Sequence, residues 1–235
     1  MTDTPLVLAL DTSTDICVGV ASGDRVLAVR RDTDRRAHVE HLAEWIREAL
    51  AEAGAAVNDV TDLVVGLGPG PFTGLRVGIA TAETLAWAGQ IPLHGVCSLD
   101  VVAYDHAHAA GGADHAGAAG PTGDFVVASD ARRKELYWAR YAPDGTRVGD
   151  PQVSAPAALP DLPVIGPGAD LYPSVHHGRT DDGPRAIDPG LLARIGLRLP
   201  SAGQQPLYLR RPDAVAPTTR KSALVSHKRL TIGRA

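Results

Sequence analysis

Cysteine, methionine and aromatic side chains are scarce in this sequence of 235 residues, which has two cysteines, one methionine and 4% aromatic residues. Cys17 and Cys97 lie far apart in apolar surroundings, which argues against a disulfide framework and against a thiolate metal cluster. Long apolar runs are also missing, since none approaches the ~18 residues that a membrane span needs. Pro5 and Asp11 bracket only a short apolar stretch, so no amino-terminal signal is expected. We therefore expect a soluble, cytoplasmic protein.

Acidic residues outnumber basic ones, but the balance changes along the chain. The formal net charge is −4, and the segment after Pro217 has five basic residues and no acidic one, which leaves 18 basic and 27 acidic residues before it. An acidic body should repel a polyanion, which disfavours broad nucleic-acid binding by the folded part. We expect residues 217–235 to form a disordered basic tail, with RNA contact by this tail as an alternative.

Hydrophobic periodicity predicts an α/β lobe in the first part of the chain. Turns rich in Asp, Ser and Gly separate three apolar segments, which should form an antiparallel meander of strands. The pattern then alternates between helical and strand periods, which indicates a mixed sheet with helices. The expected strands are 5–11, 16–22, 25–31, 62–68 and 91–96, and the expected helices are 36–53, 73–88 and one that begins at Ser98.

A second lobe is predicted after residues 105–123, which lose all periodicity and read as a flexible connection. Beyond it, the order of apolar strand, aspartate, polar turn and second strand found in residues 6–22 recurs in residues 125–141. Asp130 then takes the place of Asp11. We interpret this recurrence as a duplication, although the same pattern is common in unrelated hairpins.

This division gives an N-terminal lobe of residues 1–104 and a smaller C-terminal lobe of residues 124–216. Proline is frequent in the second lobe, where residues 162–168 are expected to form a strand and turn. Asp188 should cap a helix that has proline at its first position, and residues 206–211 are expected to form a late strand or an edge segment.

The segment GLGPGPFTGLRVG, residues 66–78, lies between an expected strand and an expected helix. A Walker loop requires Lys and Ser or Thr directly after its last glycine, whereas Leu75 and Arg76 follow Gly74. A dinucleotide fingerprint requires a third glycine where Thr73 stands, and it requires the first strand of the fold. Neither phosphate-binding loop is supported.

Small residues recur every four positions on the helix that follows, at Gly74, Gly78, Ala82 and Ala86. A helix face without side chains lets another backbone approach closely, and two interior glycines cost roughly 0.5 to 1 kcal/mol each relative to alanine. The neighbour could be the lobe's own sheet or a partner protein, and the pattern leaves both open.

Four strings together resemble the TsaB (YeaZ) family, the accessory subunit of tRNA threonylcarbamoyladenosine synthesis. They are LALDTST, GLGPGPFTGLRVGIA, DARRKELYWARY and PLYLRRPDA. The match runs in order from Leu6 to about Ala214, although serine is more usual at the position of Pro71. The resemblance implies the two-lobed α/β fold of actin, sugar kinases and Hsp70, with duplicated mixed-sheet lobes and a reduced second lobe.

The resemblance also implies partners. The chain would pair with TsaD, the catalytic paralogue, and would work with the ATPase TsaE to place threonylcarbamoyl on N6 of adenosine 37 in tRNAs that read codons beginning with A. It would reach tRNA through this complex and form a homodimer without its partner. ATP and metal are expected in the complex, and this chain is expected to bind no cofactor strongly. A stand-alone metal- or ATP-dependent hydrolase or kinase of glycoprotease type, with the same fold, is the alternative.

Site residues follow from the same resemblance. The first two helices would form the partner interface, through His38, His41, Trp45, Thr73, Gly74, Leu75, Gly78, Ile79 and Ala82. Asp11, Thr12 and Ser13 most resemble the remnant of a nucleotide site, the alternative being a turn closed by local hydrogen bonds. Ser98 and Val102 stand where the catalytic paralogue has two metal-binding histidines, so neither a metal ligand nor a catalytic residue is expected.

Overall fold

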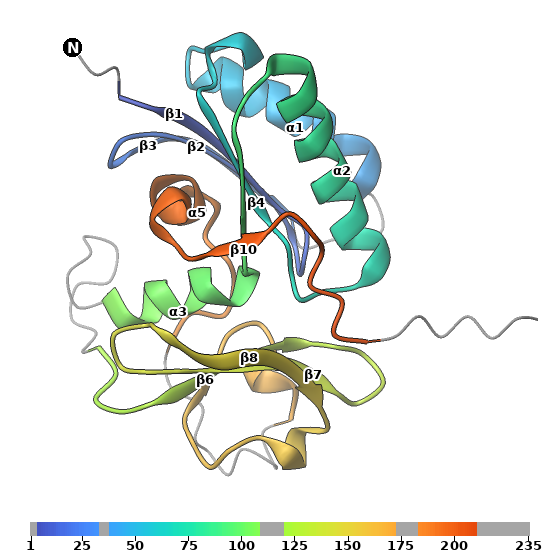
Figure 1. The fold of residues 1–235 in the computed structure, drawn as a ribbon, viewed down its shortest axis with the longest axis vertical. Helices are drawn as coiled ribbons and strands as arrows, with labels where there is room; N and C mark the ends of the chain where they lie inside the picture. Colours follow the sequence, from blue (N-terminus) through green and yellow to red (C-terminus); the bar gives the residue numbers. More distant parts are fainter. Residues whose placement is uncertain (1–3, 33–37, 109–119, 173–182, 211–235) are drawn as a thin grey trace, which may run out of the picture.

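The computed structural model describes residues 4–32, 38–108, 120–172 and 183–210. Figure 1 shows two sheets with a helix between them, and two further helices on the outer face of the first sheet. Most of the predicted flexible connection and the whole predicted tail lie outside the described residues. None of the helices in the described part of the chain combines the length and the apolar character needed to cross a bilayer.

The first sheet has the strand order β10-β5-β4-β1-β2-β3. Its strands are β1 (Leu6–Asp11), β2 (Ile16–Ser22), β3 (Arg25–Asp32), β4 (Asp62–Gly66), β5 (Leu93–Val96) and β10 (Ser201–Gly203). The first three form the predicted antiparallel meander, whereas β4 pairs in parallel with β1 and β5 pairs in parallel with β4. The strand predictions for this lobe are confirmed.

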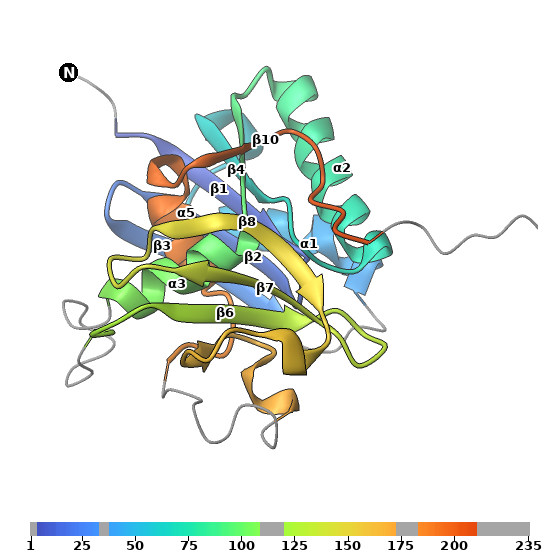
Figure 2. The same ribbon diagram turned by 60° about the horizontal axis from the view of Figure 1, so that its bottom comes forward.

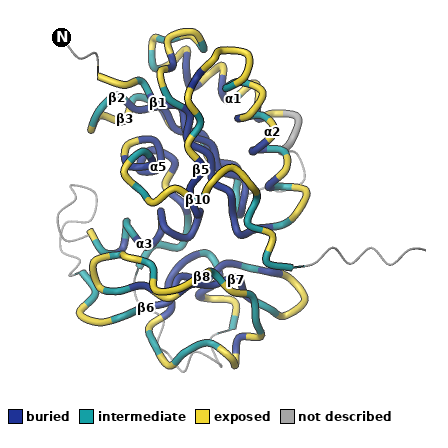
Figure 3. Tube along the Cα trace, in the orientation of Figure 1, coloured by how far each residue is buried: buried dark blue, intermediate teal, exposed yellow. Residues whose placement is uncertain are grey.

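Helices cover both faces of the first sheet because its strands alternate their apolar side chains. The helices α1 (His38–Glu52) and α2 (Phe72–Gly89) lie on one face, where Leu8 and Leu10 join their core. The helices α3 (Ser98–His108) and α5 (Pro189–Ile195) lie on the other face, where Val7 and Ala9 join theirs. Figure 3 shows the strands buried between exposed outer helix surfaces. Gly54, with φ of +71°, ends the region of α1 as predicted.

The second sheet has the order β8-β7-β6-β9, and Figure 2 shows β8, β7 and β6 side by side. Its strands are β6 (Phe125–Asp130), β7 (Leu136–Tyr141), β8 (Arg147–Ser154) and β9 (Val164–Ile165). It also begins with an antiparallel meander, followed by a strand parallel to the first. The fold is therefore a mixed α/β fold with two mixed sheets.

The last part of the chain returns to the first sheet. Helix α5 packs on β2, and β10 pairs with β5, although both elements fall inside the range predicted for the second lobe. Asp188 caps α5 as predicted, since its carboxylate accepts a hydrogen bond of 2.8 Å from the Leu191 N–H. Short 3-10 turns lie at Val57–Asp59, Pro156–Ala158, Ala169–Leu171 and Gly196–Arg198.

The predicted late strand at 206–211 is wrong for its described residues. Residues 206–210 form no strand, and the strand of this region is β10, a few residues earlier. The Leu207 N–H instead donates to the Leu67 carbonyl at 2.8 Å, so this segment lies along the glycine-rich loop after β4.

Candidate functional site

The turn between β1 and β2, residues 11–13, closes on itself. Asp11 is fully buried, and its Oδ1 accepts hydrogen bonds from the N–H and the hydroxyl of Ser13, both at 2.7 Å. Asp11 Oδ2 accepts a bond of 2.5 Å from the Ser98 hydroxyl at the start of α3. Burial raises the pKa of Asp11, and these hydrogen bonds oppose the shift. The alternative of a turn closed by local hydrogen bonds describes this geometry.

Backbone packs directly on this turn. A Cβ added at Gly66 would lie 1.7 Å from Asp11 Oδ2, and one added at Gly70 would lie 2.7 Å from the Ser13 carbonyl oxygen. The Ser98 hydroxyl also accepts from the Gly68 N–H at 3.1 Å. The glycine-rich loop therefore exists to let the chain approach its own buried carboxylate.

This arrangement does not fit a phosphate or a metal ion at Asp11. Both carboxylate oxygens already bind side chains of the same chain, and Gly66 leaves no room beside them. Ser98 donates inward to Asp11, and Val102 lies in the apolar core, so neither position faces a site. Within the described ranges, no group of three or more His, Cys, Asp or Glu side chains is placed to hold a metal ion.

The space above Gly74 and Gly78 is filled from within the chain. The Thr12 hydroxyl donates to the Gly74 carbonyl at 2.8 Å, and a Cβ added at Gly78 would lie 2.3 Å from Thr12 Oγ1. The prediction that these two glycines leave a bare face for a partner's helix is wrong, because Thr12 from the β1–β2 turn occupies it. The two glycines instead fix α2 against the turn.

The structure separates the predicted interface residues into two groups. Leu75, Gly78, Ile79 and Ala82 are buried on the inner side of α2, which removes their side chains from any surface. Of the remainder, His41 and Thr73 are exposed, and Gly74 and Trp45 are half-buried, with Trp45 packed against the core under α1. His38 begins α1, and its side chain lies outside what the structure describes.

The accessible side of α2 carries a different set of small residues. Thr73, Ala80, Thr84 and Ala88 are exposed and follow one another at seven-, four- and four-residue spacing. Such spacing places them along one stripe of the helix. This stripe, defined by these four residues, lies on the side of α2 opposite to the buried residues and faces outward.

Sequence reasoning missed the exposed aromatic residues of α2. Trp87 is 84% exposed near the end of the helix, beside a groove of about 690 Å³ that Leu93 and Gln204 help to line. Phe72, at the start of the helix, is 51% exposed. Phe72 is four residues before Arg76, and Trp87 is four residues after Glu83, so each aromatic residue shares a helix face with a charged one. This spacing was the signal that could have identified them.

The second hairpin turn repeats the first in geometry and differs in surroundings. The Arg132 N–H donates to Asp130 Oδ1 at 2.7 Å, which matches the bond between Ser13 and Asp11. Arg132, Arg133 and Lys134 then adopt φ values of 62°, 53° and 62°, and all three are exposed. Left-handed backbone is unusual for residues other than glycine, so the closed turn holds three consecutive cations in a strained form.

A buried polar cluster joins helix α3 to the second sheet. Asp100 of α3 accepts a bond of 2.8 Å from the Tyr141 hydroxyl of β7 and lies 3.4 Å from Arg147 Nε of β8. Burial raises the pKa of Asp100, of Tyr141 and of Cys97, the last to about 12. A thiol with so high a pKa stays protonated at neutral pH, so Cys97 is unsuited to act as a nucleophile.

Several known proteins resemble this chain in sequence. The family described as "TsaD: tRNA N6-adenosine threonylcarbamoyltransferase" matches residues 30–179. An uncharacterized protein of Mycobacterium tuberculosis (strain H37Rv) is 40% identical over 213 residues, which cover 88% of this chain and 93% of that protein. The tRNA threonylcarbamoyladenosine biosynthesis protein TsaB of Escherichia coli (strain K12) is 32% identical over 138 residues, which cover 59% of this chain and 55% of that protein.

Solved structures resemble the chain over a longer range. An uncharacterized protein of Pseudomonas aeruginosa, described as similar to peptidase YEAZ, has 30% identity and a TM-score of 0.65, and the match covers 88% of this chain and all of that one. YeaZ of the same organism has 27% identity and the same TM-score, over 87% of this chain and all of its own.

Proposed function

This chain belongs to the TsaB (YeaZ) family, and on that premise we propose that it takes part in tRNA threonylcarbamoyladenosine biosynthesis as a non-catalytic subunit. It pairs with a TsaD-type catalytic paralogue and works with a TsaE-type ATPase, so that threonylcarbamoyl is placed on N6 of adenosine 37 in tRNAs reading codons that begin with A. The observation that carries the proposal is the 32% identity to a relative named for this pathway.

The closed β1–β2 turn supports a role without catalysis by this chain alone. Asp11 uses both oxygens in hydrogen bonds to its own chain, and Gly66 and Gly70 pack directly on the turn. We infer that the isolated chain binds neither nucleotide nor metal strongly, and that ATP and metal act elsewhere in the complex. The repeated order of meander and parallel strand supports descent of the two lobes from one actin-like unit.

The outer surfaces of α1 and α2 are the proposed contact with the catalytic partner. The exposed stripe of Thr73, Ala80, Thr84 and Ala88 lets a helix of the partner approach closely, and Trp87 lies on the same outer side. Tryptophan is frequent among the residues that dominate binding energy in interfaces. A stable contact would bury on the order of 1,200 to 2,000 Å² in total. A paralogue of the same fold can offer matching helices.

Sizing chromatography of the purified chain with a TsaD-type protein tests this interface. Ala80→Arg places a long charged side chain on the exposed stripe and should abolish co-elution, because the two helices can no longer approach. Ala157→Arg makes the same change at an exposed position of the second lobe and should co-elute like the unmodified chain. Equal co-elution of both variants would contradict the interface.

Reconstitution of the tRNA modification tests the role. We expect the TsaD- and TsaE-type proteins to form threonylcarbamoyladenosine only when this chain is added, and we expect no modification from this chain alone. Ala80→Arg should stimulate threonylcarbamoyladenosine formation less than the unmodified chain, in proportion to its reduced co-elution with the TsaD-type protein. Modification at an unchanged rate without the chain would overturn the proposed function.

A further inference from the structure

We propose that this chain contacts RNA directly through an aromatic–basic patch formed by Phe72, Arg76, Tyr208, Arg210 and the turn of residues 132–134. The inference rests on the proposed function and deepens it, because that proposal brings tRNA to the chain only through the catalytic partner. Phosphates would contact the cations of the patch, and unpaired bases would stack on its rings.

The aromatic part of the patch is a pair of exposed rings. The ring centroids of Phe72 and Tyr208 lie 5.1 Å apart, at an interplanar angle of 35°. The guanidinium carbon of Arg76 lies 5.2 Å from the Phe72 centroid. The sequence has only two phenylalanines, yet this one is half exposed, and Tyr208 is 41% exposed. Exposed rings beside arginine are the usual platform for unpaired bases, because every base has a face that can stack.

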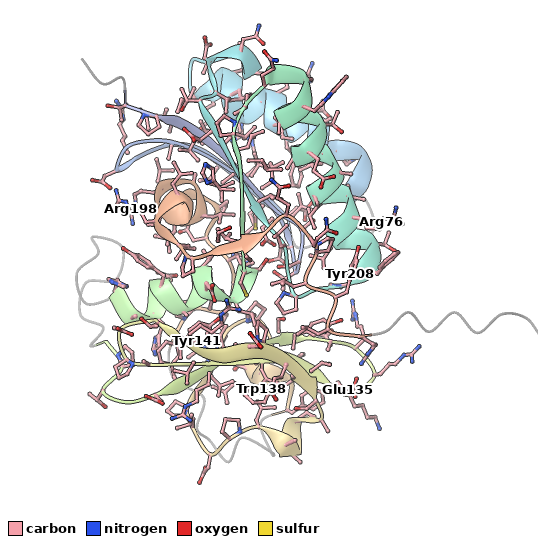
Figure 4. All side chains as sticks on the ribbon, viewed as in Figure 1. Arg76, Glu135, Trp138, Tyr141, Arg198 and Tyr208 are labelled. Atoms are coloured by element: carbon pink, nitrogen blue, oxygen red, sulfur yellow. The ribbon has the colours of Figure 1, made fainter. Side chains whose placement is uncertain are left out.

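Arg210 links these rings to the cationic turn. Its Nη1 donates to the Ala131 carbonyl at 3.1 Å, and its Nη2 pairs with Glu135. Arg210 therefore holds the two ends of the turn, Ala131 and Glu135, two residues beyond Tyr208 in the sequence. Figure 4 shows Arg76, Tyr208 and Glu135 along the same side of the molecule.

The charge of the patch favours RNA over a protein surface. The patch has five cationic side chains, of which Arg132 pairs with Asp130 and Arg210 pairs with Glu135, so these two carboxylates offset part of its positive charge. The chain before residue 218 has nine more acidic than basic residues, so this concentration of positive charge stands out.

The sequence continues this charge beyond the patch. The described part of the chain ends at Arg210, and residues 211–235 contain six basic residues and one acidic residue. The positive charge of the patch is thus followed by a basic segment in the sequence.

Fluorescence anisotropy of a labelled tRNA with adenosine at position 37 tests the proposal. The probe is titrated with the full chain alone and with its TsaD-type complex, at several salt concentrations, and variants are compared in the chain alone because Arg76 lies one turn from Ala80 of the proposed partner contact. The double variant Arg76→Ala/Lys134→Ala should reduce the slope of log affinity against log salt by roughly 1.4, at about 0.7 for each lost contact to single-stranded RNA. Tyr208→Leu should weaken binding about tenfold through lost stacking.

The matched control is the double variant Arg25→Ala/Arg194→Ala, which removes the same charge from exposed positions on β3 and α5. Its salt slope should equal that of the unmodified chain. Equal slopes for both double variants would overturn the proposal. It would also be overturned if the chain alone bound no tRNA and the TsaD-type complex bound tRNA no more tightly than the TsaD-type protein alone. Loss of co-elution with the partner, with unchanged RNA binding by the chain alone, would assign the patch to protein contact and overturn it.

The two proposals can fail separately. A chain that never co-elutes with a TsaD-type protein contradicts the proposed function, and the titration of the chain alone still decides whether the patch binds tRNA. Conversely, a chain that assembles and stimulates modification, but whose patch variants keep full tRNA affinity and salt slope, contradicts only the RNA contact.

Discussion

The two hairpin turns share one local design and have opposite surroundings. Asp11 and Asp130 each accept a hydrogen bond of 2.7 Å from the backbone N–H two residues later. Asp11 is then sealed by the glycine loop, α2 and Ser98, whereas Asp130 remains partly exposed in an ion pair with Arg132. The same local hydrogen-bond pattern therefore forms a buried turn in the first lobe and an exposed cationic turn in the second lobe.

This difference comes from the elements that follow each meander. After β4 the chain passes through a glycine loop into the 18 residues of α2, which covers the first turn. After β9 it forms only the short 3-10 turn Ala169–Leu171 in the described residues before 173. Local hydrogen bonding fixes the shape of a turn, and the next element in the chain fixes its burial.

The largest effect is expected from Gly66→Ala, compared with Gly168→Ala in the second lobe. The new methyl group at position 66 would overlap the Asp11 carboxylate at 1.7 Å, whereas at position 168 the nearest atoms are 3.0 Å away. Overpacking should lower the free energy of unfolding by about 3 kcal/mol at Gly66 and by about 1 kcal/mol at Gly168. Urea denaturation of both variants measures this, and equal losses would refute the idea that only the first turn is tightly enclosed.

A smaller effect is expected in the pH dependence of Asp11→Asn. Burial raises the pKa of Asp11 above 3.8, so the folded protein binds more protons than the unfolded chain in the window from about pH 4 up to the raised pKa. The free energy of unfolding contributed by Asp11 therefore falls as pH rises through that window. Asparagine cannot ionise, so the stability of the variant relative to the unmodified protein should increase with pH, by about 1.4 kcal/mol per unit of raised pKa.

Urea denaturation at a series of pH values measures this difference. The contribution of Asp100, whose pKa burial also raises, is present in both proteins and cancels. Asp130→Asn, the matched change in the partly exposed turn, serves as the comparison for the amide substitution itself. A stability difference between Asp11→Asn and the unmodified protein that stays constant from pH 4 to pH 8 would disagree with the buried carboxylate.

The smallest change in the free energy of unfolding is expected from Lys134→Gly, and it is the only increase. Lys134 has a φ of 62°, a backbone form that costs lysine more than glycine, so the free energy of unfolding should rise by about 0.5 to 1 kcal/mol. Thr122→Gly, at an exposed position without positive φ, should lower it slightly. Thermal denaturation can rank the two variants, and a loss of stability in Lys134→Gly would contradict the strained turn.

Periodicity and turn residues were sufficient to predict most of the first sheet and its helices. The predicted and observed bounds of β2 agree, because turn residues flank its continuous apolar run on both sides. The same reasoning missed β10, whose three residues Ser201–Gly203 have no apolar pattern and depend on pairing with β5. It also missed β8, where exposed polar residues hide the strand signal.

The glycines of α2 show what a sequence cannot supply. Their spacing correctly indicated that something approaches the helix closely, but the neighbour is Thr12, which bonds to Gly74 from 62 positions earlier in the chain. Trp45 was expected at the partner interface and is half-buried against the core, whereas Trp87 is exposed. Which side of a helix faces outward depends on the sheet beneath it, and that register is a tertiary property.

The return of α5 and β10 to the first sheet has a consequence for the order in which the protein matures during translation. Helix α5 lies so close to β2 that a methyl group at Gly19 would overlap the Pro189 carbonyl oxygen. The first half of the chain therefore leaves the ribosome without the helix that covers β1, β2 and β3 on one face of its sheet. That face remains open to chaperones, or to aggregation, until nearly all of the second lobe has been synthesised.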